Sequence, residues 1–93
     1  MVNKNNNVYI ALQNNEESRP LIEAIEHDNS DARVEFYPAM VKIDAPGRLV
    51  IRRDTIEGLI GRDWDPQEIH VNLISLSGNV VEDEDQFALE RGR

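Results

Sequence analysis

The apolar residues of this chain fall in short runs that alternate with polar residues, and this pattern constrains the fold more than any other feature. Residues 8–13 (VYIALQ), 33–37 (RVEFY), 40–45 (MVKIDA) and 86–90 (QFALE) place apolar side chains at every second position. Alternation with a period of two is typical of β-strands that turn one face to a core. Pro, Gly, Asn or Asp residues separate the runs, so we expect several short strands joined by turns.

Two longer segments carry helix signals. Residues 14–28 (NNEESRPLIEAIEHD) offer Asn and Ser as capping residues, Pro20 in the first turn and apolar residues at helical spacing. Residues 54–61 (DTIEGLIG) begin with Asp54, a predicted N-cap with an acid three residues on, and end at Gly61. These segments predict a main helix and a shorter second helix.

The order of elements is strand, helix, three strands, short helix, then two or three strands. It predicts one α+β domain in which two or three helices pack on mostly antiparallel sheet, split in two because each helix needs its own apolar surface. The three successive strands have tight connections, the last at Pro46-Gly47, and are expected to pair antiparallel. Residues 1–7 include four Asn and are expected to form a mobile arm, with residues 8–93 as the domain.

Residues 69–78 (IHVNLISLSG) break the alternation. DPQE at 65–68 leaves one helical turn before a strand expected from Ile69, and up to Leu73 its apolar residues keep one parity. Ile74 and Leu76 then have the opposite parity, which makes both faces of the strand apolar. A β-bulge after Leu73, or a helix packed behind the strand, would return both residues to the core. The alternative is an exposed patch that another protein covers. That patch consists of Asn72, Ile74, Ser75 and Leu76.

Composition excludes several classes of function. A net charge of −8 argues against nucleic acid, which binds to a concentrated basic surface, and against anionic membranes. The chain has no Cys, so it has no disulfide framework, no thiolate nucleophile and no Cys-ligated zinc, and the cytoplasm is the expected location. No apolar run approaches the roughly 20 residues of a membrane span.

Residues suited to catalysis are few. Ser75 or Ser77 would need His70 or the helical His27 within hydrogen-bond reach to act as a nucleophile, and the sequence contains no nucleophile elbow or Gly-rich phosphate loop. The acids at 82–85 (EDED) would point to alternate sides of an extended segment, which does not converge six oxygens on calcium. Trp64 is interpreted as a core residue, with an interface anchor as the alternative. We therefore expect a binding protein without cofactor or metal, not an enzyme.

Most of the chain resembles a known family. The segments IALQNNEESRPLIEAIE, RLVIRRDTIEGLIGRDWDPQEIHVNLISLSGNV and DEDQFALE are similar to the small effector (coupling or regulatory) proteins of multicomponent phenol hydroxylases. These belong to the wider effector family of soluble diiron monooxygenases, which includes methane monooxygenase component B. The resemblance extends from about Val8 to Arg91.

The resemblance implies a cofactor-free α+β protein that docks on a diiron hydroxylase oligomer and couples dioxygen activation to hydroxylation of an aromatic substrate. Iron and catalytic carboxylates would belong to the hydroxylase. The segment from Asn72 to Gly78 matches a hydroxylase-contact region of the methane enzyme's effector. The residues expected to bind the partner are His70, Asn72, Ile74, Ser75, Leu76 and Ser77.

Several alternatives stay open. The chain could be a stand-alone acidic interaction module, such as an inhibitor or adaptor, or a small hydrolase using Ser75 or Ser77 with His70. An exposed apolar strand would also let free molecules associate weakly. For an effector, replacing Ile74 or Leu76 by Asp is expected to preserve the fold and abolish stimulation.

Overall fold

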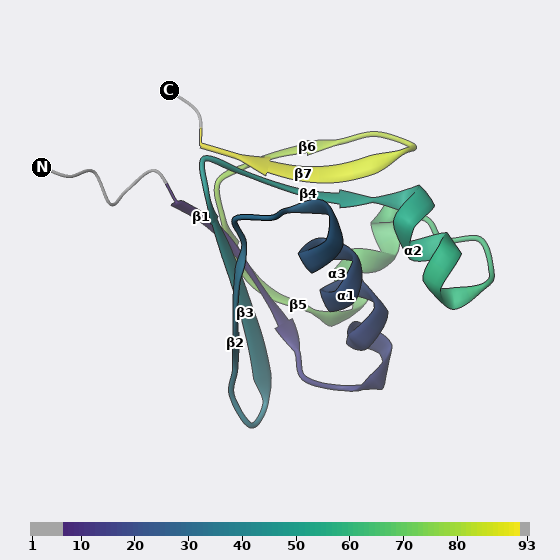
Figure 1. Ribbon diagram of the computed structural model, residues 1–93, viewed down its shortest axis with the longest axis horizontal. Helices are drawn as coiled ribbons and strands as arrows, with labels where there is room; N and C mark the ends of the chain where they lie inside the picture. The colour runs from purple at the N-terminus through teal and green to yellow at the C-terminus, as the bar shows by residue number, and fades with distance from the viewer. Residues whose placement is uncertain (1–6, 92–93) are drawn as a thin grey trace, which may run out of the picture.

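Two antiparallel sheets and three α-helices make up the part of the chain that the computed structural model describes, residues 7–91 (Figure 1). Along the chain the elements are β1 (Asn7–Gln13), a 3-10 turn η2 (Glu16–Ser18), α1 (Arg19–Asp28), β2 (Arg33–Phe36), β3 (Met40–Pro46), β4 (Arg48–Arg52), α2 (Arg53–Ile60), a 3-10 turn η3 (Pro66–Glu68), α3 (Ile69–Asn72), β5 (Leu73–Ser77), β6 (Asn79–Glu82) and β7 (Gln86–Glu90). The α+β class and the division into two sheets are confirmed.

The pairing of the strands follows the prediction except at one connection. The first sheet has the order β2-β3-β1-β5 and the second the order β4-β7-β6, with every pair antiparallel. The prediction that β4 pairs with β3 is wrong. Because β3 already has a strand on each side, the chain turns at Gly47, whose φ is +78°, and carries β4 into the other sheet beside β7.

The core lies between the two sheets and α1. β1 contributes Val8, Ile10 and Leu12 with 0% exposure, and their spacing is the alternation that the sequence shows. Asn29 then joins α1 to the second sheet. Its side-chain oxygen accepts from the Val50 amide at 2.9 Å, and its amide nitrogen donates to the Val50 carbonyl at 2.7 Å. This contact occupies backbone groups at the free edge of β4.

The predicted cap of α2 is wrong at its start and right at its end. Arg52 is the N-cap, and neither it nor Asp54 provides a side-chain cap. Gly61 ends the helix in the left-handed conformation, with φ of 73°, as predicted. The Glu57 carboxylate, expected to close a capping box, instead accepts from the Trp64 backbone amide at 2.8 Å. That bond holds the connection after α2 against the helix.

The expected mobile arm falls on residues 1–6, which lie outside the described residues, and on Asn7, which is the first residue of β1. Within residues 7–91, no helix has the length and apolar character needed to cross a membrane.

Candidate docking surface

A short helix precedes the strand that the sequence singled out. Asp65 accepts from the Gln67 amide at 2.9 Å and Glu68 accepts from the Asp65 amide at 3.2 Å, which completes a capping box. The helical turn that starts there continues through α3, so the prediction of a strand from Ile69 is wrong. Ile69 and Asn72 are buried three residues apart, as on one face of a helix, whereas Val71 is 65% exposed.

A β-bulge follows this helix and explains the break in alternation. Along β5, Leu73 lies opposite Leu12 and Ser75 lies opposite Ala11, so Ile74 is the extra, unpaired residue. A bulge after Leu73 was one of the two predicted explanations. It returns Leu76 to the core side, opposite Ile10, but leaves Ile74 outside and 48% exposed.

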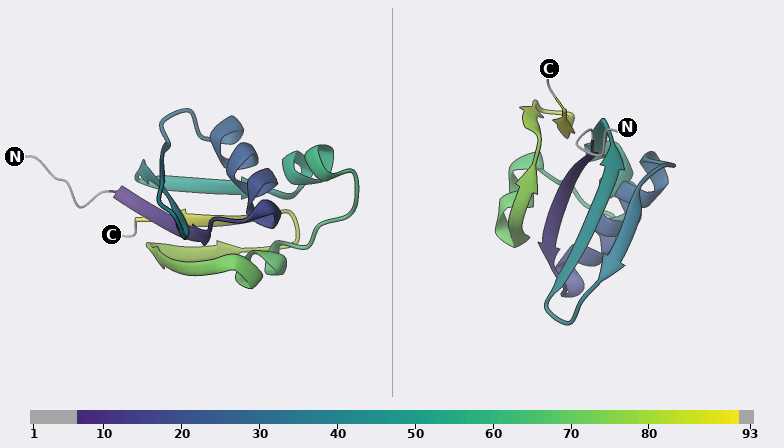
Figure 2. Two further views of the ribbon diagram at one scale, coloured as in Figure 1. Left: turned by 90° about the horizontal axis from the view of Figure 1, so that it is seen from below. Right: turned by 90° about the vertical axis from the view of Figure 1, so that its left-hand side faces the viewer.

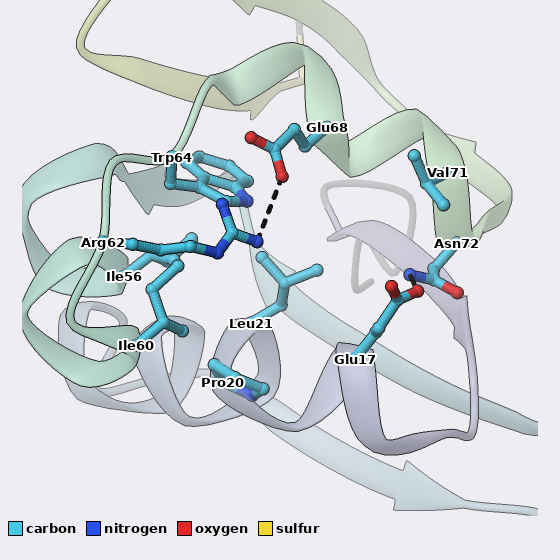
Figure 3. Close-up of a pocket in the computed structure, with 10 residues that line it drawn as sticks. All are labelled: Glu17, Pro20, Leu21, Ile56, Ile60, Arg62, Trp64, Glu68, Val71 and Asn72. Carbon is cyan, nitrogen blue, oxygen red and sulfur yellow. Dashed lines mark hydrogen bonds and ion pairs between the residues drawn. The ribbon is translucent and has the colours of Figure 1, made fainter.

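Asn72 is buried, with 5% of its surface exposed, and its side chain makes two hydrogen bonds. Its oxygen accepts from Asn15 Nδ2 at 2.8 Å. Its Nδ2 donates to Glu17 Oε1 at 3.2 Å, and Figure 3 shows these two side chains next to each other. Asn15 also accepts from the Ser18 amide at 3.0 Å and so caps η2. The prediction that Asn72 belongs to an exposed patch is wrong, because the last turn of α3 points it inward.

The remaining predicted residues are dispersed. His70 is exposed on α3, and its ring stands edge-on to Phe87 with the centroids 6.1 Å apart. Ser75 is exposed on the outer face of the sheet, with its hydroxyl 3.5 Å from that of Tyr9. Half-buried Ser77 accepts from Arg91 Nη2 at 3.2 Å. Among residues 7–91 no hydrogen bond joins either serine to His70, so the Ser-His pair that a hydrolase needs is not assembled.

Of the predicted patch, Ile74 and Ser75 are exposed as expected. Leu76 is half-buried and packs against the core, which contradicts its expected exposure. Large apolar side chains are nevertheless exposed along α3, β5 and β6. Since β5 and β6 follow one another and each is the outer strand of its sheet, they form one continuous side of the molecule (Figure 2). We call this surface the apolar edge. It consists of Val71 (65% exposed), Ile74 (48%), Val80 (47%) and Val81 (44%).

A groove of about 210 Å³ adjoins the apolar edge at Val71 and lies between α1, α2 and α3 (Figure 3). Leu21 and the buried Trp64 line its apolar part. Arg62 Nη2 lies 3.5 Å from Glu68 Oε1 at its rim. The interpretation of Trp64 as a core residue is confirmed by its 4% exposure.

Glu57 and the acids at 82–85 have structural roles. Hydrogen bonds from the Trp64 amide and then from the Arg53 guanidinium lower the pKa of Glu57 below its ordinary value. The acids at 82–85 do not lie on one extended segment as expected, because Glu82 ends β6 and residues 83–85 turn the chain into β7. Asp83 closes that turn by accepting from the amides of Asp85 at 2.8 Å and Gln86 at 3.0 Å.

Within residues 7–91, no cluster of three or more His, Cys, Asp or Glu side chains is arranged to hold a metal ion.

Sequence comparison relates this chain to one protein family and to a phenol 2-monooxygenase component. The sequence model of the MmoB/DmpM family matches residues 6–90. The stimulatory component DmpM of phenol 2-monooxygenase from Pseudomonas sp. (strain CF600) is 52% identical over 83 residues, which cover 89% of this chain and 92% of that protein.

Solved structures show the same relationship. A chain in a structure of the phenol hydroxylase–regulatory protein complex is 51% identical, with a TM-score of 0.89 over 92% of this chain and 99% of that one. A chain in a second such structure is 50% identical, with a TM-score of 0.85 over 90% and 98%. The regulatory protein B of soluble methane monooxygenase shares the fold, with 21% identity and a TM-score of 0.75 over 99% of this chain and 70% of that one. The resemblance read from the sequence is confirmed, and this chain belongs to the MmoB/DmpM family.

Proposed function

We propose that this protein is the regulatory effector of a multicomponent phenol hydroxylase: it binds the diiron hydroxylase and stimulates it without catalysing a reaction itself. The observation that carries the proposal is the 52% identity, over nearly the whole chain, with a stimulatory component of phenol 2-monooxygenase. The fold supports it, because it superposes with a TM-score of 0.89 on a chain from a hydroxylase–regulatory protein complex. Iron, the aromatic substrate and dioxygen would all bind to the hydroxylase. The cytoplasm stays our prediction for the location.

The apolar edge is our candidate for the surface that meets the hydroxylase. A large apolar side chain contributes about 1.5–3 kcal/mol when it is fully buried. Burying the exposed half of the four side chains would then contribute roughly 3–6 kcal/mol, before the costs of association. Polar and charged side chains around the edge would keep the free protein soluble.

Stimulation requires that the effector bind one conformation of the hydroxylase more tightly than another. A hundredfold shift between two conformations corresponds to about 2.7 kcal/mol of differential binding. The free energy available from burying the apolar edge exceeds this differential binding free energy. Part of it is therefore enough if only one hydroxylase conformation covers the edge completely. The coupling of dioxygen activation to hydroxylation would follow from that conformational preference.

A titration tests the function. The purified protein is added to a fixed amount of phenol hydroxylase and its reductase, and phenol turnover is measured. We expect turnover to rise to a maximum near a stoichiometric ratio. Unchanged turnover would favour the stand-alone acidic module, and activity of the protein alone would favour the hydrolase.

The docking surface is tested by Ile74→Asp, with Leu59→Asp as a matched control. Both residues are 48% exposed, but Leu59 lies on α2, outside the apolar edge. We expect both variants to keep the circular dichroism spectrum of the parent, and Ile74→Asp alone to lose stimulation, because a charge at the edge must be desolvated on docking. Equal stimulation by both variants would refute the assignment. Leu76→Asp is no longer a suitable probe, since Leu76 packs on the core and its replacement is expected to destabilise the fold.

A further inference from the structure

Aromatic side chains are exposed at the tip of the β2–β3 hairpin, a feature that the apolar edge does not include. Phe36 is 63% exposed and Tyr37 44% exposed, and Pro38 beside them is exposed as well. Aromatic residues are enriched at the centres of protein interfaces, where they supply much of the binding energy. Two neighbouring aromatic side chains in water therefore indicate a surface that a partner covers. We call Phe36, Tyr37 and Pro38 the aromatic tip.

The aromatic tip is held in a fixed shape. The Tyr37 amide donates to the Met40 carbonyl at 2.8 Å, which closes the hairpin. Asn14 clamps the turn from the side, because its amide donates to the Ala39 carbonyl at 3.2 Å and its Nδ2 donates to the Tyr37 carbonyl at 2.9 Å. A loop that is already ordered loses little conformational entropy on binding, so its contacts contribute more fully to affinity.

The tip lies at the same end of the four-stranded sheet as the start of β5. The hairpin reaches past the end of β1, and the start of β5 lies along that end of the sheet (Figures 1 and 2). In the order β2-β3-β1-β5, neighbouring strands are about 4.8 Å apart, so roughly 10–15 Å separates the hairpin from β5. An interface of standard size, about 800 Å² on each partner, is about 30 Å across and covers both.

One short segment fixes both surfaces. Asn14 holds the aromatic tip, and the next residue, Asn15, holds Asn72, the last residue of α3 before β5 begins. Hydrogen bonds from two adjacent residues thus tie both surfaces to one segment, an arrangement that suits two anchors for one partner.

We propose that the aromatic tip is a second anchor for the hydroxylase, in which Phe36 and Tyr37 enter an apolar pocket with a basic side chain at its rim. The inference rests on the proposed function, which supplies the partner. The basic side chain follows from Glu35, whose carboxylate lies 3.2 Å from the Tyr37 hydroxyl, and from the net charge of −8. A cation of the hydroxylase near Glu35 would make a charge-assisted hydrogen bond as the tip docks.

The test compares Phe36→Ser/Tyr37→Ser with Leu59→Ser, which removes a similarly exposed apolar side chain from α2. Thermal melting first establishes that the double variant folds. In the turnover titration we expect it to need at least tenfold more protein for half-maximal stimulation, while Leu59→Ser matches the parent. Glu35→Gln is expected to weaken the salt dependence of the titration midpoint.

A fluorescent probe gives a second readout that does not depend on turnover. The chain has no Cys, so Ala39→Cys carries a solvent-sensitive dye beside the tip, and Leu59→Cys carries it at the control site. Adding hydroxylase should change the emission at residue 39 alone. If the parent stimulates but the double variant has the same midpoint and the dye at residue 39 does not respond, the second anchor is refuted and the proposed function stands. If the parent itself does not stimulate, the proposed function fails and the second anchor with it.

Discussion

Replacing Asn72 by Leu distinguishes two roles for this residue: holding the start of β5 in place, or contacting the hydroxylase. Leu keeps a similar volume but removes the acceptor for Asn15 and the donor to Glu17. The bond between the two amides is worth about 0.5–1.5 kcal/mol, since both partners are neutral. The bond to Glu17 involves a charge, but Glu17 is exposed and water can replace the lost donor, so it adds about 0.5 kcal/mol or less.

The expected loss of unfolding free energy is therefore about 0.5–2 kcal/mol. For a domain of this size each kcal/mol lowers the melting temperature by roughly 4–8 °C, so a decrease of about 2–16 °C is expected. Thermal melting of the isolated protein measures it, with the exposed Asn79→Leu as a control that should change stability by less than about 0.5 kcal/mol. Amide exchange in β5 should become faster in the Asn72 variant, because the strand loses its attachment to η2.

One combination of results would refute this reasoning. If Asn72→Leu melts at the temperature of the parent and still fails to stimulate the hydroxylase, the Asn72 side chain acts at the interface, as the sequence predicted. If melting decreases and stimulation recovers at a temperature well below the new transition, the side chain acts by holding β5.

Two further predictions concern stability. Gly78→Ala should destabilise the fold by more than about 1 kcal/mol in urea unfolding, because φ is +128° and an added Cβ would lie 2.8 Å from Val8 Cγ1. Gly58→Ala is the control: it lies within α2 with open space around the new methyl group, and should be neutral or stabilising. In Glu57→Gln, the free energy of unfolding should decrease less steeply than in the parent as the pH is lowered into the acid range. The folded pKa of Glu57 lies below its ordinary 4.5, so its contribution is complete above that pH and is lost as the pH falls through the folded value. A parent and variant with the same pH profile would contradict this assignment.

The elements that the sequence predicted correctly are those in which a local signal determines the outcome. β1 alternates because one of its faces is buried in the core between the two sheets and α1, and a period of two appears in any strand in that position. Gly61 ends α2 because a left-handed residue is needed there, and Gly adopts that conformation without strain. Neither result depends on residues far away in the chain.

The pairing of β4 could not be predicted in this way. The Pro46-Gly47 turn indicates that the chain changes direction, and such a turn most often joins strands that pair. Which strand lies beside β4 depends on whether β3 has a free edge, and that depends on β1 and β2, which occupy both of its sides. This is a property of the whole sheet, and no local pattern carries it.

The docking surface was only partly predictable for a similar reason. Ile69, Val71 and Leu73 are spaced two apart, which fits a strand, but the outer two are also four apart, which fits one face of a helix. The capping box at Asp65 favoured the helix, and α3 follows from it. After the helix, the pairing of β5 with β1 determines which side chains face the core. The bulge leaves Ile74 without a partner in that pairing. Ile74 is therefore exposed because of a pairing between segments more than sixty residues apart, whereas Leu76, of the same parity in the sequence, faces the core. A period of two predicts the same environment for both residues, but the register with β1 leaves only Ile74 exposed.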